Sequence, residues 1–231
     1  MKTQIIAIGG GAMSNYSQTY PIEKYILEQT GKTKPNICFM PTASGDASHN
    51  IVRFYEIFGN LPCERTHLSL FSAPPDIESI LMNQDIIYVG GGPFRNLLAL
   101  WREWSLEKIL YKAWKQGIIL AGISSGATCW FEEGMTSYTP SHIKALPALG
   151  FLKGSYCAHY DSVPNNRLRY SDLISKGEIK EGVACEDNVA LHYINGELHH
   201  VVSASPTGKA YQIKRAGDNF QQIELIPHIY L

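Results

Sequence analysis

The sequence predicts an α/β protein, with a mostly parallel β-sheet flanked by helices and an antiparallel extension toward the C-terminus. Up to residue 123, short β-branched and aliphatic runs alternate with segments whose apolar residues recur at helical spacing. Glycine clusters follow three of these runs, as expected where parallel strands end in tight loops. Beyond residue 150, short strands with turn signals replace the alternation.

The alternating part of the chain predicts strands and helices in turn. Strands are expected at residues 4–8, 36–40, 66–71, 85–89 and 117–123. Helices are expected at residues 21–28, 51–58, 77–82, 97–104 and 109–115, where apolar side chains share one face. Open α/β sheets bind ligands outside the carboxyl ends of their strands, so the loops after the last two strands are expected to share a crevice.

The C-terminal part predicts shorter elements. A strand within residues 155–161 is expected to lead into a polar loop that includes residues 164–169. Strands at residues 189–194, 198–203, 210–214 and 223–226 form the predicted antiparallel extension. Because the chain has no repeat, linker or low-complexity tract, residues 1–231 are expected to form a single domain.

The first glycine cluster, Gly9–Gly11, follows the first predicted strand. It resembles the start of the dinucleotide-binding fingerprint Gly-x-Gly-x-x-Gly, but the residues around Asn15 supply no third glycine. We therefore interpret this cluster as a tight turn at a strand end.

The amino-acid composition and net charge limit the kinds of molecule that the protein is expected to bind. The chain has 231 residues, of which 45% are hydrophobic and 18% charged, as in an ordinary globular domain. A net charge of −1 offers no basic surface for nucleic acid. The near-neutral charge suits small neutral or zwitterionic partners. No apolar run approaches the roughly 20 residues of a membrane helix, so we expect a cytoplasmic protein without a membrane partner. Five cysteines without C-x-x-C spacing argue against disulfides or structural zinc, and neither a metal nor a cofactor is expected.

The motif that best indicates chemistry is Gly-Ile-Ser-Ser-Gly-Ala at residues 122–127. In the pattern Gly-x-Ser-x-Gly, the serine lies on a sharp strand-to-helix turn that exposes its hydroxyl. Gly122 and Gly126 are expected to be small because the strand and the helix crowd each other there. We take Ser124 as a nucleophile and assign the Ser125 N–H to a developing oxyanion. The structural alternative is a simple connection with Ser124 as the helix N-cap.

A nucleophilic serine needs a histidine to accept its proton, and His159 fits this role best. It ends an apolar strand and opens a polar loop, 35 residues after Ser124. The other seven histidines are predicted at helix edges, in loops or at exposed strand positions. The structural alternative for His159 is a hydrogen-bonded residue without a chemical role.

Three motifs together resemble peptidase family S51, the group of dipeptidase E and cyanophycinase. They are residues 90–92, residues 122–127 and Ala158-His159-Tyr160-Asp161, and the similarity continues through residues 96–102, 129–134 and 190–192. The resemblance implies a class I glutamine-amidotransferase-like fold, with flavodoxin-like three-layer architecture, and a metal-free serine peptidase that is often a homodimer. It also implies Ser124 as nucleophile, His159 as base, and the N–H groups of Gly92 and Ser125 as oxyanion donors.

One departure from the family pattern concerns substrate binding. Pro93 follows the glycine triplet, where dipeptidase E has an asparagine that helps hold the substrate's N-terminal end. Proline has no N–H and no side-chain amide, so recognition of an N-terminal aspartate cannot be carried over.

A second departure concerns the acid that orients the histidine. Residues 134–139, where related sequences carry it, contain no carboxylate. Ser137 stands where an aspartate is expected, and the substitutes considered for this third triad member are Glu132, Glu133 and Asp161. Glu186 and Asp187, in a turn between two strands, are expected to be structural.

Further substrate contacts are predicted at Gly91, Pro93 and Asp161. Arg167 and Arg169 are candidates to bind a substrate carboxylate through bidentate hydrogen bonds, with surface ion pairs as the structural alternative.

The leading hypothesis is a serine exopeptidase that acts on dipeptides or short peptides. The alternatives are a cyanophycinase-like or isoaspartyl peptide hydrolase, motivated by Pro93, and a binding module without turnover, motivated by the missing carboxylate.

Overall fold

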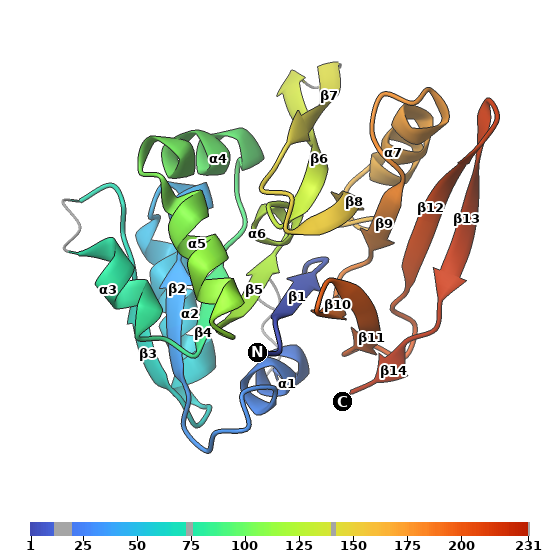
Figure 1. Cartoon of the computed structure of the whole chain (residues 1–231). Coiled ribbons are helices and arrows are strands. Elements are labelled where there is room, and N and C mark those ends of the chain that lie inside the picture. The colour runs from blue at the N-terminus through green and yellow to red at the C-terminus, as the bar shows by residue number, and fades with distance from the viewer. Residues whose placement is uncertain (12–19, 73–75, 140–141, 231) are drawn as a thin grey trace.

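A computed structural model of the chain describes residues 1–11, 20–72, 76–139 and 142–230, with only the backbone of residues 137–139 and 142 (Figure 1). The parallel part of its main sheet consists of β1 (Gln4–Ile8), β5 (Ile119–Ile123), β4 (Ile86–Val89), β2 (Asn36–Met40) and β3 (Glu64–His67). On the other side of β1 follow the antiparallel strands β10 (Val189–Ile194) and β11 (Glu197–Ser203), and then β14 (His228–Ile229).

Helices cover both faces of this sheet, which explains why its strands are continuous apolar runs. One face packs against α1 (Pro21–Glu28) and α2 (Ser48–Gly59). The other packs against α3 (Ile77–Met82), α4 (Phe94–Glu103) and α5 (Leu106–Lys115). Side chains alternate between these two cores along each strand; in β1, Ile6 and Ile8 face α1 and α2, whereas Ile5 and Ala7 face the opposite helices. The predicted layered α/β fold is confirmed.

A second sheet stands beside the first (Figure 1). In spatial order it contains β13 (Asn219–Leu225), β12 (Ala210–Ala216), β9 (Gly182–Cys185), β8 (Leu152–Cys157), β6 (Phe131–Thr139) and β7 (His142–Pro147). The helix α7 (Asn166–Ser175) packs against it through Tyr170, Leu173 and Ile174. This sheet is mixed, because β8 runs parallel to both β6 and β9.

The structure corrects the expected arrangement of the C-terminal part. The predicted extension divides between two sheets: β10 and β11 continue the main sheet, whereas β12 and β13 belong to the second. The expected polar loop at residues 164–169 is mostly the start of α7. Only the second half of α7 carries buried apolar residues, so its first turns give no helical pattern. The strand expected at residues 66–71 is β3, which begins earlier and ends at His67.

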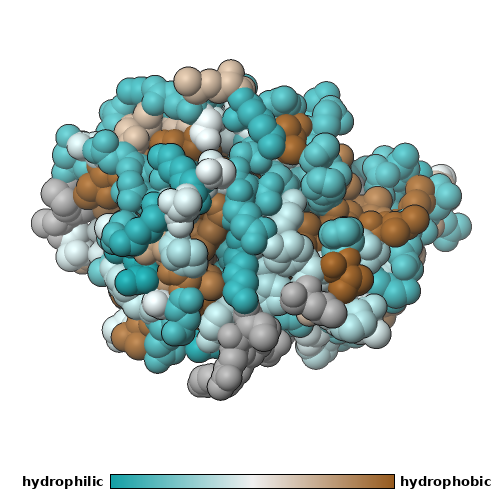
Figure 2. Space-filling model, turned by 90° about the horizontal axis from the view of Figure 1, so that it is seen from below, coloured by the Kyte–Doolittle hydropathy of each residue, from teal (hydrophilic) through white to brown (hydrophobic). Residues whose placement is uncertain are grey.

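One face of the molecule is largely polar, with apolar residues scattered over it (Figure 2). Figure 2 shows hydrophilic residues over most of the face that lies below the view of Figure 1. Among the described residues, no helix is both long and apolar enough to cross a membrane. All five cysteines are buried and free.

Candidate active site

Ser124 occupies a strained turn between β5 and the short helix α6 (Ser125–Thr128). Its backbone angles are φ 58° and ψ −123°, a region that residues other than glycine rarely adopt. Its N–H donates to the carbonyl oxygen of Ile8 at 3.0 Å, which ties the turn to the end of β1. The local geometry is that of the predicted exposed serine on a strand-to-helix turn.

The two glycines around Ser124 are required by close backbone contacts. A Cβ on Gly122 would lie 2.0 Å from the carbonyl oxygen of Gly126. A Cβ on Gly126 would lie 2.3 Å from the carbonyl oxygen of Val89. Both neighbours are backbone atoms, one in α6 and one in β4 (Ile86–Val89), so the predicted crowding of strand and helix is confirmed.

His159 lies just beyond β8, at the junction of the two sheets. Its backbone is left-handed, with φ 51°, and its N–H donates to the carbonyl oxygen of Gly9 at 3.2 Å. The ring Nδ1 lies 2.7 Å from Oδ1 of Asp187. In the tautomer that donates from Nδ1, Nε2 is left with a lone pair that accepts a proton.

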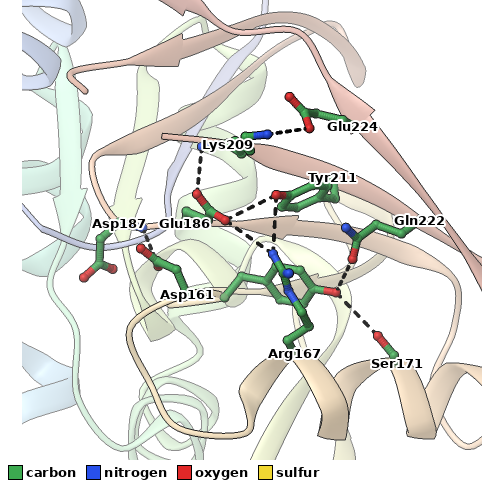
Figure 3. Close-up of polar contacts among 10 residues, drawn as sticks. Asp161, Arg167, Ser171, Glu186, Asp187, Lys209, Tyr211, Gln222 and Glu224 are labelled. Atoms are coloured by element: carbon green, nitrogen blue, oxygen red, sulfur yellow. Dashed lines mark hydrogen bonds and ion pairs between the residues drawn. The ribbon is translucent and has the colours of Figure 1, made fainter. Parts of the chain in front are cut away.

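Asp187 is thus the carboxylate in contact with His159, whereas the sequence indicated a structural role for it. The residues considered there as third triad member were Ser137, Glu132, Glu133 and Asp161. Asp187 lies between β9 and β10, which belong to different sheets, so the connecting loop passes the junction where His159 lies. Asp161 has a supporting contact: its Oδ1 accepts the N–H of Asp187 at 3.0 Å (Figure 3).

The contacts of Asp187 keep its carboxylate ionised. Burial by itself would raise the pKa of Asp187, but hydrogen bonds from His159 and Ser162 and the charge of His159 outweigh it. The pKa of Asp187 therefore lies below its ordinary value, and a negative charge faces His159 at neutral pH.

Ser124 and His159 open onto the same cavity, with a volume of about 500 Å³. Gly92 and Ser125, the predicted oxyanion donors, also line it. Further lining residues come from the start of α4, from α6, from the β6–β7 hairpin and from the start of α7; they include Pro93, Phe94, Arg95, Thr128, Met135, Ile143 and Asn166. A smaller neighbouring cavity of about 260 Å³ also contacts Ser124 and His159.

A family model described as peptidase family S51 matches residues 5–201 of the chain. The chain belongs to this family. It is similar to the uncharacterized peptidase YgaJ of Bacillus subtilis (strain 168), with 48% identity over 223 residues and 96% of each chain covered. Together with the family match, this relative makes the chain a serine-type peptidase.

Solved structures share the fold. A crystal structure of a peptidase from an acI-B1 Actinobacterium superposes with a TM-score of 0.74 at 19% identity, covering 98% of this chain and 95% of that one. A putative peptidase E protein from Listeria monocytogenes EGD-e superposes with a TM-score of 0.67 at 15% identity, covering 89% of this chain and all of that one.

The glutamates considered for the triad of this S51 peptidase have other partners. Glu132 accepts the N–H of Gly154 at 2.7 Å and pairs with Nζ of Lys180 at 3.1 Å. The Gly154 hydrogen bond, followed by that from Lys180, lowers the pKa of Glu132. Glu133 accepts the Lys180 N–H at 2.9 Å. Both glutamates thus fasten strands of the second sheet, and the Ser137 side chain lies outside the described part of the chain.

Arg167 has partners within the protein (Figure 3). Its guanidinium lies 3.4 Å from both Oε1 of Glu186 and the hydroxyl of Tyr211, and it stacks over the rings of Tyr160 and Tyr211 at 4.8 and 5.2 Å. Glu186 also accepts the N–H of Lys209 at 3.0 Å. Arg167 therefore joins α7 to the β9–β10 loop and to β12.

The other predicted contact residues divide between the two cavities. Pro93 lines the larger one and Gly91 the smaller one. Arg167, Arg169 and Asp161 are not among the described residues that line either cavity, and neither lining includes a described Asp or Glu. Within the described ranges, no three His, Cys, Asp or Glu side chains gather as metal ligands.

His192 differs from its expected place at an exposed strand position, because it is fully buried in β10. Its Nδ1 lies 2.7 Å from the Tyr25 hydroxyl, and its Nε2 lies 3.1 Å from Oε1 of Gln4. Burial, with smaller contributions from nearby cationic groups, lowers the pKa of His192 to about 4. This neutral histidine joins α1 to the main sheet.

Proposed function

We propose that this S51 peptidase is a serine exopeptidase of the dipeptidase E type, hydrolysing dipeptides or short peptides with Ser124, His159 and Asp187. The observation that carries the proposal is that a strained serine and a histidine paired with an aspartate face one cavity. The spatial arrangement of such groups identifies a nucleophile, a base and an orienting acid, whatever their order in the chain.

In the proposed reaction, the Ser124 Oγ attacks the carbonyl carbon of the substrate while Nε2 of His159 takes the hydroxyl proton. The imidazolium then gives this proton to the leaving amine nitrogen as the C–N bond breaks. A water molecule, deprotonated by the same nitrogen, hydrolyses the acyl-enzyme and restores Ser124. The negative charge of Asp187 stabilises the imidazolium in both steps.

The N–H groups of Gly92 and Ser125 are the proposed oxyanion donors. Ser125 is the first residue of α6, and the first N–H groups of a helix have no acceptor within it. Among the described residues, no hydrogen bond uses the N–H of Gly92. Two free donors on the wall that Ser124 shares would stabilise the charge that develops on the carbonyl oxygen.

The cavity favours short substrates. Its volume of about 500 Å³ lies in the range of small-ligand sites. Pro93 and Phe94 form one wall, and Met135 and Ile143 of the β6–β7 hairpin form another. Peptide residues beyond the first few would have to extend past these walls.

The test is hydrolysis of a dipeptide panel that includes Asp-x and β-Asp-x peptides. Ser124→Ala should lower kcat by at least about 10⁴-fold on every hydrolysed peptide, because no other group replaces the nucleophile. The matched control is Ser175→Ala at the end of α7, which should keep wild-type kcat. Full activity of Ser124→Ala would overturn the assignment.

A β-aspartyl or cyanophycinase-like specificity is the second candidate. Pro93 supports it, because it lines the larger cavity and lacks the amide that would hold an N-terminal end. A higher kcat/KM for β-Asp-Arg than for α-dipeptides would establish it. The hypothesis of a binding module without turnover rested on the lack of a carboxylate to orient His159. Asp187 provides a carboxylate in contact with His159, so we do not pursue this hypothesis.

A further inference from the structure

The glycine triplet after β1 contacts both loops that form the His159–Asp187 pair. The carbonyl oxygen of Gly9 accepts the N–H of His159 at 3.2 Å. The carbonyl oxygen of Gly10 accepts the N–H of Asn188, next to Asp187, at 2.9 Å. The triplet interpreted above as a simple turn therefore binds two segments 28 residues apart in sequence.

Gly10 lies directly against the hydrogen bond between the two side chains. A Cβ at this position would lie 2.0 Å from Oδ1 of Asp187 and 2.4 Å from both Nδ1 and Cε1 of His159. Oδ1 and Nδ1 are the two atoms that form the 2.7 Å contact. Any side chain at residue 10 would therefore need the space that this hydrogen bond occupies.

The neighbouring glycines are constrained differently. A Cβ on Gly9 would meet the backbone carbonyl oxygen of Glu186 at 2.2 Å, and Gly11 has a left-handed backbone with φ 102°. Substitution at either would strain the main chain. The φ of Gly10 is not positive, and its closest neighbours are the ends of side chains, which can rotate away. A methyl group at Gly10 is therefore expected to displace the side chains and leave the fold intact.

We infer that Gly10 is a positioning residue for catalysis, whose missing side chain lets His159 and Asp187 meet with the ring correctly aligned. The inference rests on the proposed roles of these two residues. The glycine triplet thus holds His159 in the orientation that a base needs. The space that a side chain at Gly10 would take is filled by His159 and Asp187.

The first test is the kinetics of Gly10→Ala on whichever dipeptide the wild type hydrolyses best. We expect kcat to fall by about 10²-fold or more, because a misaligned histidine loses its orienting acid, while KM stays within about threefold. Gly59→Ala is the matched control, since a Cβ there has no atom within 4 Å, and it should keep wild-type kcat. Wild-type kcat in Gly10→Ala would overturn the inference.

A double-mutant cycle separates positioning from general damage. Asp187→Ala already removes the hydrogen bond that the new methyl would break, so adding Gly10→Ala to it should lower kcat by a much smaller factor than in the wild type, with only the contact to the His159 ring remaining. Equal losses from Gly10→Ala in both backgrounds would contradict an action through the pair. If Gly10→Ala alone does not fold, recovery of folding in the Asp187→Ala background supports the placement, and continued failure there overturns it.

A readout without turnover keeps this inference distinct from the proposed function. The proton on Nδ1 of His159 should give a downfield NMR signal in the wild type and in Gly59→Ala, because Asp187 accepts it. The signal should disappear in Gly10→Ala and in Asp187→Ala. If Ser124→Ala remained fully active, the proposed function would fail, but this NMR signal would still test the role of Gly10. An unchanged signal in Gly10→Ala would refute the positioning role of Gly10.

Discussion

Ser124 and His159 are held in place by different parts of the molecule and by different forces. Ser124 follows β5, a fully buried central strand of the main sheet, and its turn is fixed by backbone packing around Gly122 and Gly126. His159 and Asp187 lie in loops that follow the central strands β8 and β9 of the second sheet, with side chains 27% and 23% exposed. Packing fixes the nucleophile side, whereas a few polar contacts fix the base side. Substitutions of the glycines that pack around Ser124 should therefore affect folding, and substitutions of His159 or Asp187 should affect activity.

Among the substitutions that test this comparison, the largest effect is expected on kcat, from a change at the His159–Asp187 pair. Asp187→Asn should lower kcat by on the order of 10⁴-fold, since an amide favours the wrong histidine tautomer and does not stabilise the imidazolium. The melting temperature should change little because the side chain is partly exposed. Steady-state kinetics and thermal unfolding measure the two quantities, with Asp218→Asn in the exposed β12–β13 turn as control. Near-wild-type kcat in Asp187→Asn would mean that another group orients His159.

Gly126→Ala tests the packing around the Ser124 turn in the same way. Its methyl group would meet the backbone of Val89 and Gly90, so the free energy of unfolding should fall by on the order of 3 kcal/mol. Urea denaturation measures this loss, and Gly59→Ala serves as the control. An unchanged urea midpoint would show that the turn can move, and the contrast between the two sides would fail.

The stability of the main sheet and its helices should depend on pH through the buried side chain of Glu23. Glu23 is buried in α1, and burial raises its pKa to about 7 against smaller opposing effects of its own backbone N–H and of the Arg53 charge. The folded state thus holds this proton more tightly than the unfolded chain. As pH rises from 4.5 to 7, the wild type should lose roughly 3 kcal/mol of stability, which Glu23→Gln should not lose.

Denaturant unfolding of wild type and Glu23→Gln between pH 4 and pH 8 measures this difference. Glu103→Gln, an exposed residue of α4, should follow the wild type. Parallel pH dependence of wild type and Glu23→Gln would show that Glu23 is hydrated or paired in solution.

The smallest expected effect belongs to Arg167. Arg167→Ala removes stacking on Tyr160 and Tyr211 and an exposed contact with Glu186, so stability should fall by about 1 kcal/mol while KM is unchanged. Lys176→Ala at the other end of α7 is the control. A tenfold rise in KM only for peptides with a free C-terminal carboxylate would instead support the predicted substrate contact.

The sequence predicts the main sheet better than the second sheet for a physical reason. Strands covered on both faces appear as uninterrupted apolar runs, and the predicted bounds of β1, β2 and β10 match the structure. The second sheet is partly exposed, and its strand β13 is polar along most of its length, so no comparable run marks it.

The site divides in the same way. That Ser124 and His159 lie at one cavity was predictable, because each follows a recognisable strand and Ser124 carries a local motif. No sequence motif marks Asp187, because its contact with His159 forms only where the main sheet and the second sheet adjoin. The role proposed for Gly10 depends on the same meeting and is equally hidden in the sequence.

The pairing of β1 determines when the active site forms during synthesis. Gln4 pairs with Ile194, which lies 190 residues later in the chain, and Gly9 bonds to both His159 and Val189. A growing chain therefore carries the Ser124 turn long before the residues that complete the base. The site proposed above is therefore incomplete until β10 has paired with β1. Pairing over so long a sequence separation also predicts slow folding.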